Sequence, residues 1–108
     1  SFNQSQSNLR ELLSHPLCSV ISDGVYVRGR PHPRLYGTFA SLLGDISRDR
    51  GWLSLAEAVH RITARPAARF HIAGRGRLAP GFHADLVLFD PLTIAGPATY
   101  DAPTTPPT

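Results

Sequence analysis

The chain of 108 residues is long enough for one small domain or for part of a larger one, and its apolar fraction of 42% excludes global disorder. Its net charge is +3, but all eleven basic residues are arginines scattered singly along the chain, so we expect no nucleic-acid partner. The single cysteine, Cys18, excludes an intrachain disulfide and a cysteine-based zinc motif, and we expect it to be a small buried residue in a strand.

Residues 5–16 predict a short helix, and the residues that follow predict a strand. Ser5 or Ser7 can cap the helix, and its leucines recur at i, i+3 and i+4. Pro16 ends it, because the residue before a proline is pushed out of the α region. The apolar run 17–21 (LCSVI) lies between turn-forming residues, which fits a fully buried strand of a parallel sheet.

Asp23 follows this predicted strand and has two interpretations. In α/β barrels the catalytic residues lie at the carboxyl ends of the strands, and a helix, a buried strand, an acid, a long loop and a helix make one such unit. Alternatively, Asp23-Gly24 is an ordinary turn, since this dipeptide is common in turns. The spacing alone leaves both interpretations open.

Residues 24–37 form a loop that is long for a connection in a compact domain, and such loops are often functional. Arg34 presents a planar fork that suits a substrate carboxylate, or it is a solvated loop arginine. His32 is a candidate ligand or acid–base group, or a structural histidine before a proline.

Three helical segments follow the loop. Thr38 is the expected cap of a helix over residues 38–51, with Gly51 just past its end. Ser54 and Glu57 make a capping-box pattern for the next helix, and Pro66 is expected at the first position of a short one.

After residue 71 the composition changes to glycine, proline and extended-chain residues. Residues 84–90 (ADLVLFD) predict a short strand that Asp90-Pro91 ends, and the Pro- and Thr-rich remainder has at most a short strand near Ile94 or Thr99-Tyr100. We therefore expect two parts, residues 1–70 and residues 71–108.

Neither metal nor phosphate chemistry is complete in this sequence. No H-x-H or H-x-x-x-H pair occurs, so the chain alone cannot supply the histidines of a zinc site. Gly74, Gly76 and Gly81 lack the spacing of a dinucleotide loop, and Asp85 is expected to serve a turn.

Two sets of motifs together resemble a known family. Residues 74–90 (GRGRLAPGFHADLVLFD) are similar to the C-terminal signature of the amidohydrolase superfamily. The segments ISDG, HPRLYGTFASLLG (residues 32–44) and LSLAEAVHRITARPAARF (residues 53–70) resemble the D-aminoacylase group, the N-acyl-D-amino-acid deacylases. The resemblance runs from about residue 8 to about residue 102 and keeps the motifs in order.

The resemblance implies an α/β fold in which residues 1–70 are the last strand and helices of a TIM-like barrel and residues 71–108 are part of a small β-sandwich. It implies a zinc-dependent hydrolase in which metal-activated water attacks the amide bond of N-acyl-D-amino acids. Asp23 then handles the proton of that water and is the one candidate metal contact in this chain, and Arg34 binds the substrate carboxylate. Ser22, Gly24, His32 and Tyr36 flank these positions and are expected to line the pocket.

The main metal ligands of this family lie on earlier strands, and a complete barrel takes about 250 residues. We therefore expect the rest of the enzyme, or other chains, as the partner that completes the barrel, and an inactive isolated chain. Another amidohydrolase acting on a cyclic amide or dipeptide, and a non-catalytic structural module, stay open as alternatives. With no signal peptide or long apolar span, we expect a cytoplasmic protein with no membrane contact.

Overall fold

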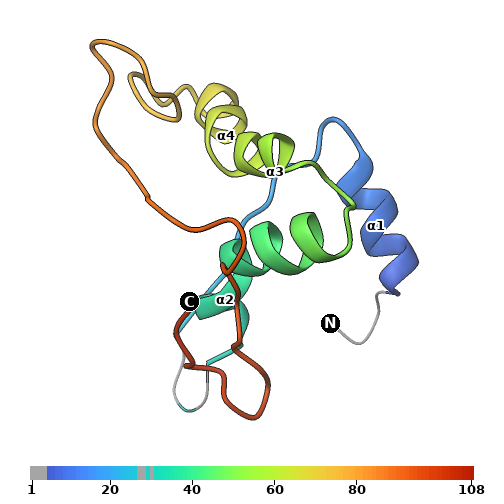
Figure 1. The fold of residues 1–108 in the computed structure, drawn as a ribbon. Coiled ribbons are helices and arrows are strands. Elements are labelled where there is room, and N and C mark those ends of the chain that lie inside the picture. The colour runs from blue at the N-terminus through green and yellow to red at the C-terminus, as the bar shows by residue number, and fades with distance from the viewer. Residues whose placement is uncertain (1–4, 27–28, 30) are drawn as a thin grey trace.

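The computed structural model describes residues 5–26, 29 and 31–108. Its helices, in chain order, are α1 (Gln6–Ser14), α2 (Arg34–Ser41), the π-helix η1 (Leu42–Asp49), α3 (Leu55–Ile62) and α4 (Ala64–Arg69). Figure 1 shows α2 and η1 as one continuous rod in the middle of the molecule, with α1 on one side of it and the short pair α3 and α4 above it. Among the described helices, none has the length and apolarity that crossing a bilayer requires.

α1 forms as its sequence predicts. Ser5 Oγ accepts a hydrogen bond from the Asn8 N–H, which satisfies one of the free amide groups of the first turn. The helix ends at His15, whose extended backbone (φ −69°, ψ 132°) is the conformation that Pro16 requires of its predecessor.

α2 begins earlier than predicted, so the assignment of Thr38 as its cap is wrong. The helix starts at Arg34 directly after Pro33, and Thr38 lies inside it. There the Thr38 hydroxyl donates to the Arg34 carbonyl oxygen at 2.7 Å, which is the i−4 bond that threonine makes within helices. The predicted end is confirmed, because Gly51 has a φ of +62° just beyond Arg50.

α3 carries half of the predicted capping box. Ser54 Oγ accepts from the Glu57 N–H at 3.2 Å, but the Glu57 carboxylate bonds Arg61 instead of returning to Ser54. Pro66 is the third residue of α4 and not its first, because the unusual backbone of Thr63 (φ −127°, ψ −89°) separates the two helices earlier.

The apolar core lies between α1, η1 and α3. Its buried members are aliphatic: Leu13, Leu42, Leu43, Ile46, Leu53 and Ala58. Val20, Phe89 and Ile94 pack against this cluster from outside the helices. Cys18 also packs against it, but it is half-buried and not enclosed as predicted.

Arg61 is a buried charged residue of α3, and only 3% of it is exposed. Its Nε donates to Glu57 Oε1 at 2.7 Å, and its Nη1 donates to the Leu13 carbonyl oxygen in the last turn of α1. A carbonyl at a helix end has no partner within its own helix, so this guanidinium supplies the missing donor and a favourable charge. The Arg61 carbonyl in turn accepts from the Val20 N–H at 3.4 Å, which ties α3 to the segment that leads to Asp23.

The bond from Arg61 lowers the pKa of the Glu57 carboxyl. Because the pKa in the folded chain lies below its ordinary value, this pair stabilises the fold at neutral pH. That stabilisation is lost as the pH falls through the lowered pKa.

The predicted strands at 17–21 and 84–90 are wrong as secondary structure for this chain. In the described residues no strand is formed, and Figure 1 shows this part of the chain as an extended orange trace that runs apart from the helices for most of its length, with Phe89 packed against the core. Leu17 is 83% exposed and Leu88 is 100% exposed. A strand exists only when a neighbouring strand pairs with its backbone, and the described part of the chain offers none.

Two glycines let the C-terminal segment lie against α2 and η1. A Cβ on Gly44 would collide with the Ile94 carbonyl oxygen, and a Cβ on Gly96 would collide with Ser41 Oγ and the Gly37 carbonyl oxygen. Arg48 adds a bond from Nη1 to the Ile94 carbonyl at 2.7 Å. The chain after residue 94 is therefore docked along the central rod.

Replacing Arg61 tests whether it ties the helices together. We expect Arg61→Met to lower the free energy of unfolding by about 2–3 kcal/mol, because the Leu13 carbonyl and the Glu57 carboxylate lose a buried partner. Urea unfolding followed by circular dichroism measures this. The matched control is Arg69→Met at the exposed end of α4, with an expected change within about 0.5 kcal/mol. Equal losses in the free energy of unfolding at both positions would show that Arg61 does not join the helices.

Candidate functional site

Asp23 and Arg34, predicted from the sequence as partners in one site, lie in direct contact. Arg34 Nη2 is 2.9 Å from Asp23 Oδ2, and Arg34 Nε donates to the Asp23 backbone carbonyl oxygen at 2.9 Å. One guanidinium thus holds both the side chain and the main chain of the acid. The side chains stay open to solvent, with 42% of Arg34 and 68% of Asp23 exposed. An ion pair this exposed adds at most about 1 kcal/mol to stability, so stability alone gives a weak reason for it.

The backbone of Asp23 is in the left-handed region, with φ +46°. Asparagine and aspartate tolerate this region better than other side chains do, and such residues occur in turns and also gather at functional sites. Beside it, Ser22 Oγ accepts from the Gly24 N–H at 3.3 Å and closes a small turn. Ser22 therefore shapes the turn that presents the Asp23 carboxylate.

Gly24 lets this turn approach α2. A Cβ at this position would lie 2.6 Å from Leu35 Cδ1 and 3.0 Å from Leu35 Cα. The second contact is with backbone, which cannot move aside as a side chain can. The absence of a side chain at residue 24 thus brings Asp23 within reach of Arg34.

His32 lies next to Arg34 and makes contacts at both ring nitrogens. Its Nδ1 accepts from the Arg34 N–H at 3.1 Å, and its Nε2 is 3.1 Å from the Tyr100 hydroxyl. Burial, followed by the nearby Arg34 guanidinium, lowers the pKa of His32. Tyr100 was not a candidate from the sequence, because it lies 68 residues away from His32 and no local pattern marks the pair.

Tyr36 is less closely connected to the site. It is the third residue of α2 and is 38% exposed, and no hydrogen bond joins its hydroxyl to Asp23 or Arg34. Its predicted place in a pocket stays a prediction.

The described residues do not fit a zinc site. Among residues 5–26, 29 and 31–108, no three His, Cys, Asp or Glu side chains come close enough together to hold a metal ion. The carboxylate proposed as a metal contact, Asp23, is paired with Arg34. A resident metal would need its ligands from elsewhere.

The glycine-rich segment after α4 forms turns. Gly74, Gly76 and Gly81 all have positive φ, and the Gly74 carbonyl accepts from the His83 N–H at 2.8 Å. The Asp85 side chain forms an ion pair with Arg75, whereas the turn or backbone hydrogen bond expected of that acid stays a prediction.

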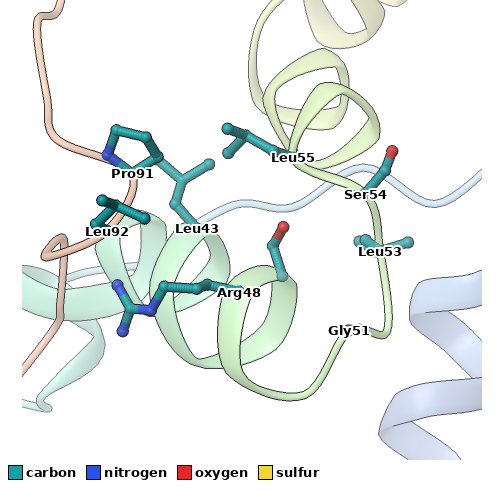
Figure 2. Close-up of a pocket in the computed structure, with 9 residues that line it drawn as sticks. Leu43, Arg48, Gly51, Leu53, Ser54, Leu55, Pro91 and Leu92 are labelled. Carbon is teal, nitrogen blue, oxygen red and sulfur yellow. The ribbon is translucent and has the colours of Figure 1, made fainter.

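A cleft of about 570 Å³ lies elsewhere, between η1, the start of α3 and Pro91-Leu92. Figure 2 shows the side chains of Leu43, Leu55 and Leu92 converging with Pro91 on it. Its one charged residue, Arg48, is bonded to Asp49 and to the Ile94 carbonyl. This cleft contains none of the predicted site residues, and its lining includes no carboxylate or histidine.

Comparison with known proteins gives a consistent result. A sequence model described as "Amidohydrolase family" matches residues 2–107. The D-aminoacylase of Alcaligenes xylosoxydans xylosoxydans is 45% identical over 103 residues, which make up 95% of this chain and 21% of that protein. The resemblance predicted from the motifs is thereby confirmed.

Two solved structures match nearly the whole chain. A crystal structure of D-aminoacylase matches with a TM-score of 0.94 and 42% identity, over 96% of this chain and 22% of that one. The N-acyl-D-glutamate deacylase of Bordetella bronchiseptica, complexed with zinc and a phosphonate inhibitor that mimics the tetrahedral intermediate, matches with a TM-score of 0.93 and 44% identity, over the same shares of the two chains. The chain spans about a fifth of the length of these relatives.

Adding a methyl group at residue 24 tests the geometry of the site. We expect Gly24→Ala to destabilise the chain by about 1–3 kcal/mol, because its Cβ overlaps the backbone of Leu35. Thermal unfolding measures this loss. Val25→Ala, at an exposed position one residue on, is the control and should cost less than about 1 kcal/mol. If Gly24→Ala is as stable as the parent chain, the close approach to α2 is not required.

Proposed function

The chain belongs to the amidohydrolase family, and on that premise we propose that it is the C-terminal part of a zinc-dependent hydrolase of N-acyl-D-amino acids. The bond broken is the linear amide between the acyl group and the amino-acid nitrogen. The observation that carries the proposal is the contact between Asp23 and Arg34. It joins a carboxylate able to move a proton to a guanidinium able to bind an anionic substrate, in a chain 45% identical to a D-aminoacylase.

Asp23 is the proposed catalytic carboxylate. It takes the proton of the attacking water and returns it to the leaving nitrogen, which is general base and then general acid catalysis. Its exposed side chain leaves room for water and substrate, and the turn made by Ser22 and Gly24 fixes where it points.

Arg34 is the proposed anchor for the substrate carboxylate. A guanidinium has five N–H donors, and the two bonds to Asp23 leave three for other acceptors. A carboxylate bound there would lie close to Asp23, which places the scissile amide within reach of the same residue. Ser22, Gly24, His32 and Tyr36 complete the proposed pocket wall.

Zinc is the proposed cofactor, as in the Bordetella bronchiseptica relative, with ligands outside the described residues. When bound, zinc lowers the pKa of a water molecule and polarises a carbonyl. In this proposal, residues 1–70 contribute the last strand and helices of a barrel, and residues 71–108 contribute part of a β-sandwich. The remaining barrel strands then supply the backbone partners that residues 17–21 and 84–90 lack in this chain.

The test uses a chimera in which this chain replaces the matching segment of the Alcaligenes D-aminoacylase. Hydrolysis of a panel of N-acyl-D-amino acids, cyclic amides and dipeptides separates the proposed substrate class from that of other amidohydrolases. A folded chimera that contains zinc but turns over none of them would favour a structural role for this chain.

In that chimera we expect Asp23→Asn to lower kcat by at least about a hundredfold, because asparagine cannot accept the proton. Zinc content and thermal stability should stay near those of the parent. Asp85→Asn, which alters an acid paired with Arg75, is the matched control and should retain activity. Near-normal turnover by Asp23→Asn would contradict the assignment.

Arg34→Ala should raise KM about tenfold to a hundredfold for substrates with a free carboxylate, because a charge-assisted pair is lost. Steady-state kinetics on acids and their methyl esters measures this, and the esters should show little change. Arg10→Ala, on the exposed face of α1, is the control. An equal rise in KM for acids and esters argues against an anchor for the carboxylate.

A further inference from the structure

The contact between His32 and Tyr100 joins the proposed substrate anchor to the C-terminal segment of the chain. The two rings meet edge to face, with centroids 5.1 Å apart and planes at 77°, in addition to the 3.1 Å contact between Nε2 and the hydroxyl. Because His32 is close to Arg34, this contact also affects how Arg34, the proposed substrate anchor, is held.

His32 holds Arg34 by its backbone. The first N–H groups of a helix have no partner within the helix, and Pro33, at the cap position of α2, has no side-chain acceptor to offer. His32 Nδ1 takes this role and accepts the Arg34 N–H, while the Thr38 hydroxyl donates to the Arg34 carbonyl. Hydrogen bonds therefore hold both the N–H and the carbonyl of Arg34, whose guanidinium contacts Asp23.

Tyr100 fixes the other side of the same ring. Because Nδ1 accepts a hydrogen bond, the single proton of the neutral imidazole lies on Nε2, where it is donated to the Tyr100 hydroxyl oxygen. Tyr100 is carried to this place by the docked segment before it, in which the Ala98 methyl lies against Gly37. The Thr99 N–H donates to the Ala102 carbonyl and closes the turn around Tyr100.

We propose that His32 is a positioning residue for Arg34, and that Tyr100 locks the His32 ring so that the C-terminal segment sets how well the substrate carboxylate is bound. The expected effect on KM rests on the proposed function, whereas the expected hydrogen bonds of the His32 ring do not. His32 acts through Arg34 and touches no reacting atom.

The sequence contains its own control for this arrangement. His15-Pro16-Leu17 repeats the local pattern, and the Leu17 N–H donates to His15 Nδ1 at 3.2 Å. That histidine lies at the exposed end of α1, with no anchor residue beside it. Substitutions at residues 15 and 32 therefore remove the same kind of bond in different surroundings.

The kinetic experiment compares variants of the chimera on acid and ester substrates. Tyr100→Phe removes one hydroxyl and keeps the ring, and we expect KM for acids to rise about threefold to tenfold with kcat within about twofold. His32→Asn keeps an acceptor near the Nδ1 position but cannot reach Tyr100, so it should match Tyr100→Phe. The double variant should be no worse than the weaker single variant, since both substitutions break the contact between His32 and Tyr100.

His32→Ala removes both bonds and should raise KM for acids more than either substitution above, while His15→Ala and Tyr26→Phe leave it unchanged. A loss of kcat with KM unchanged, or additive effects of His32→Asn and Tyr100→Phe, would overturn the positioning role.

A second measurement does not depend on activity. Long-range proton–nitrogen NMR of the chain should show the neutral His32 ring protonated on Nε2, and Tyr100→Phe should let the Nδ1–H form appear. A neutral ring already protonated on Nδ1 in the parent chain would overturn the inference even in an active chimera. If the chimera is inactive but His32 is protonated on Nε2 and changes in Tyr100→Phe, the proposed function fails. The contact of Tyr100 with the His32 ring is then still supported.

Discussion

The structure depends on one buried guanidinium. Arg61 is buried, and the Glu57 carboxylate and the Leu13 carbonyl in the last turn of α1 accept its hydrogen bonds. Removing a buried charge's partners costs several kcal/mol, so these contacts bind α1 and α3 to each other. The Arg61 carbonyl then accepts from Val20, three residues before Asp23. Arg61 thus links the end of α1, α3 and the segment that leads to the candidate site.

Beyond Val20, the turn at Ser22–Gly24 and helix α2 position the residues of the candidate site. The Ser22–Gly24 turn presents Asp23, and Gly24 allows α2 to come close enough for Arg34 to reach it. These contacts make one corner of a site and not a complete one. The exposed leucines of the extended segments and the lack of a ligand cluster in the described residues fit a chain that covers about a fifth of its relatives.

Local chemistry was predictable from the sequence, and long-range pairing was not. The Ser5 cap, the stop before Pro16 and the positive φ of Gly51 depend on neighbours within a few residues. The strands at 17–21 and 84–90 were predicted from their apolar runs, but a strand also needs a partner backbone. Thr38 was mistaken for a cap because α2 already begins at Arg34, where His32 Nδ1 accepts the first N–H of the helix. Asp23 and Arg34 were proposed from their motifs and lie in contact, whereas Tyr100 becomes visible only when the fold brings it to His32.

The central claim is that this chain supplies the acid and the anchor of a hydrolytic site that other segments complete. The most direct measurement is the rate of N-acyl-D-amino-acid hydrolysis, with added zinc, by the isolated chain and by its chimera with the Alcaligenes D-aminoacylase. We expect no hydrolysis by the chain alone and turnover by the chimera within about tenfold of the relative, which is about 1.4 kcal/mol in barrier height. Hydrolysis by the isolated chain, or a folded and zinc-loaded chimera without activity, would contradict it.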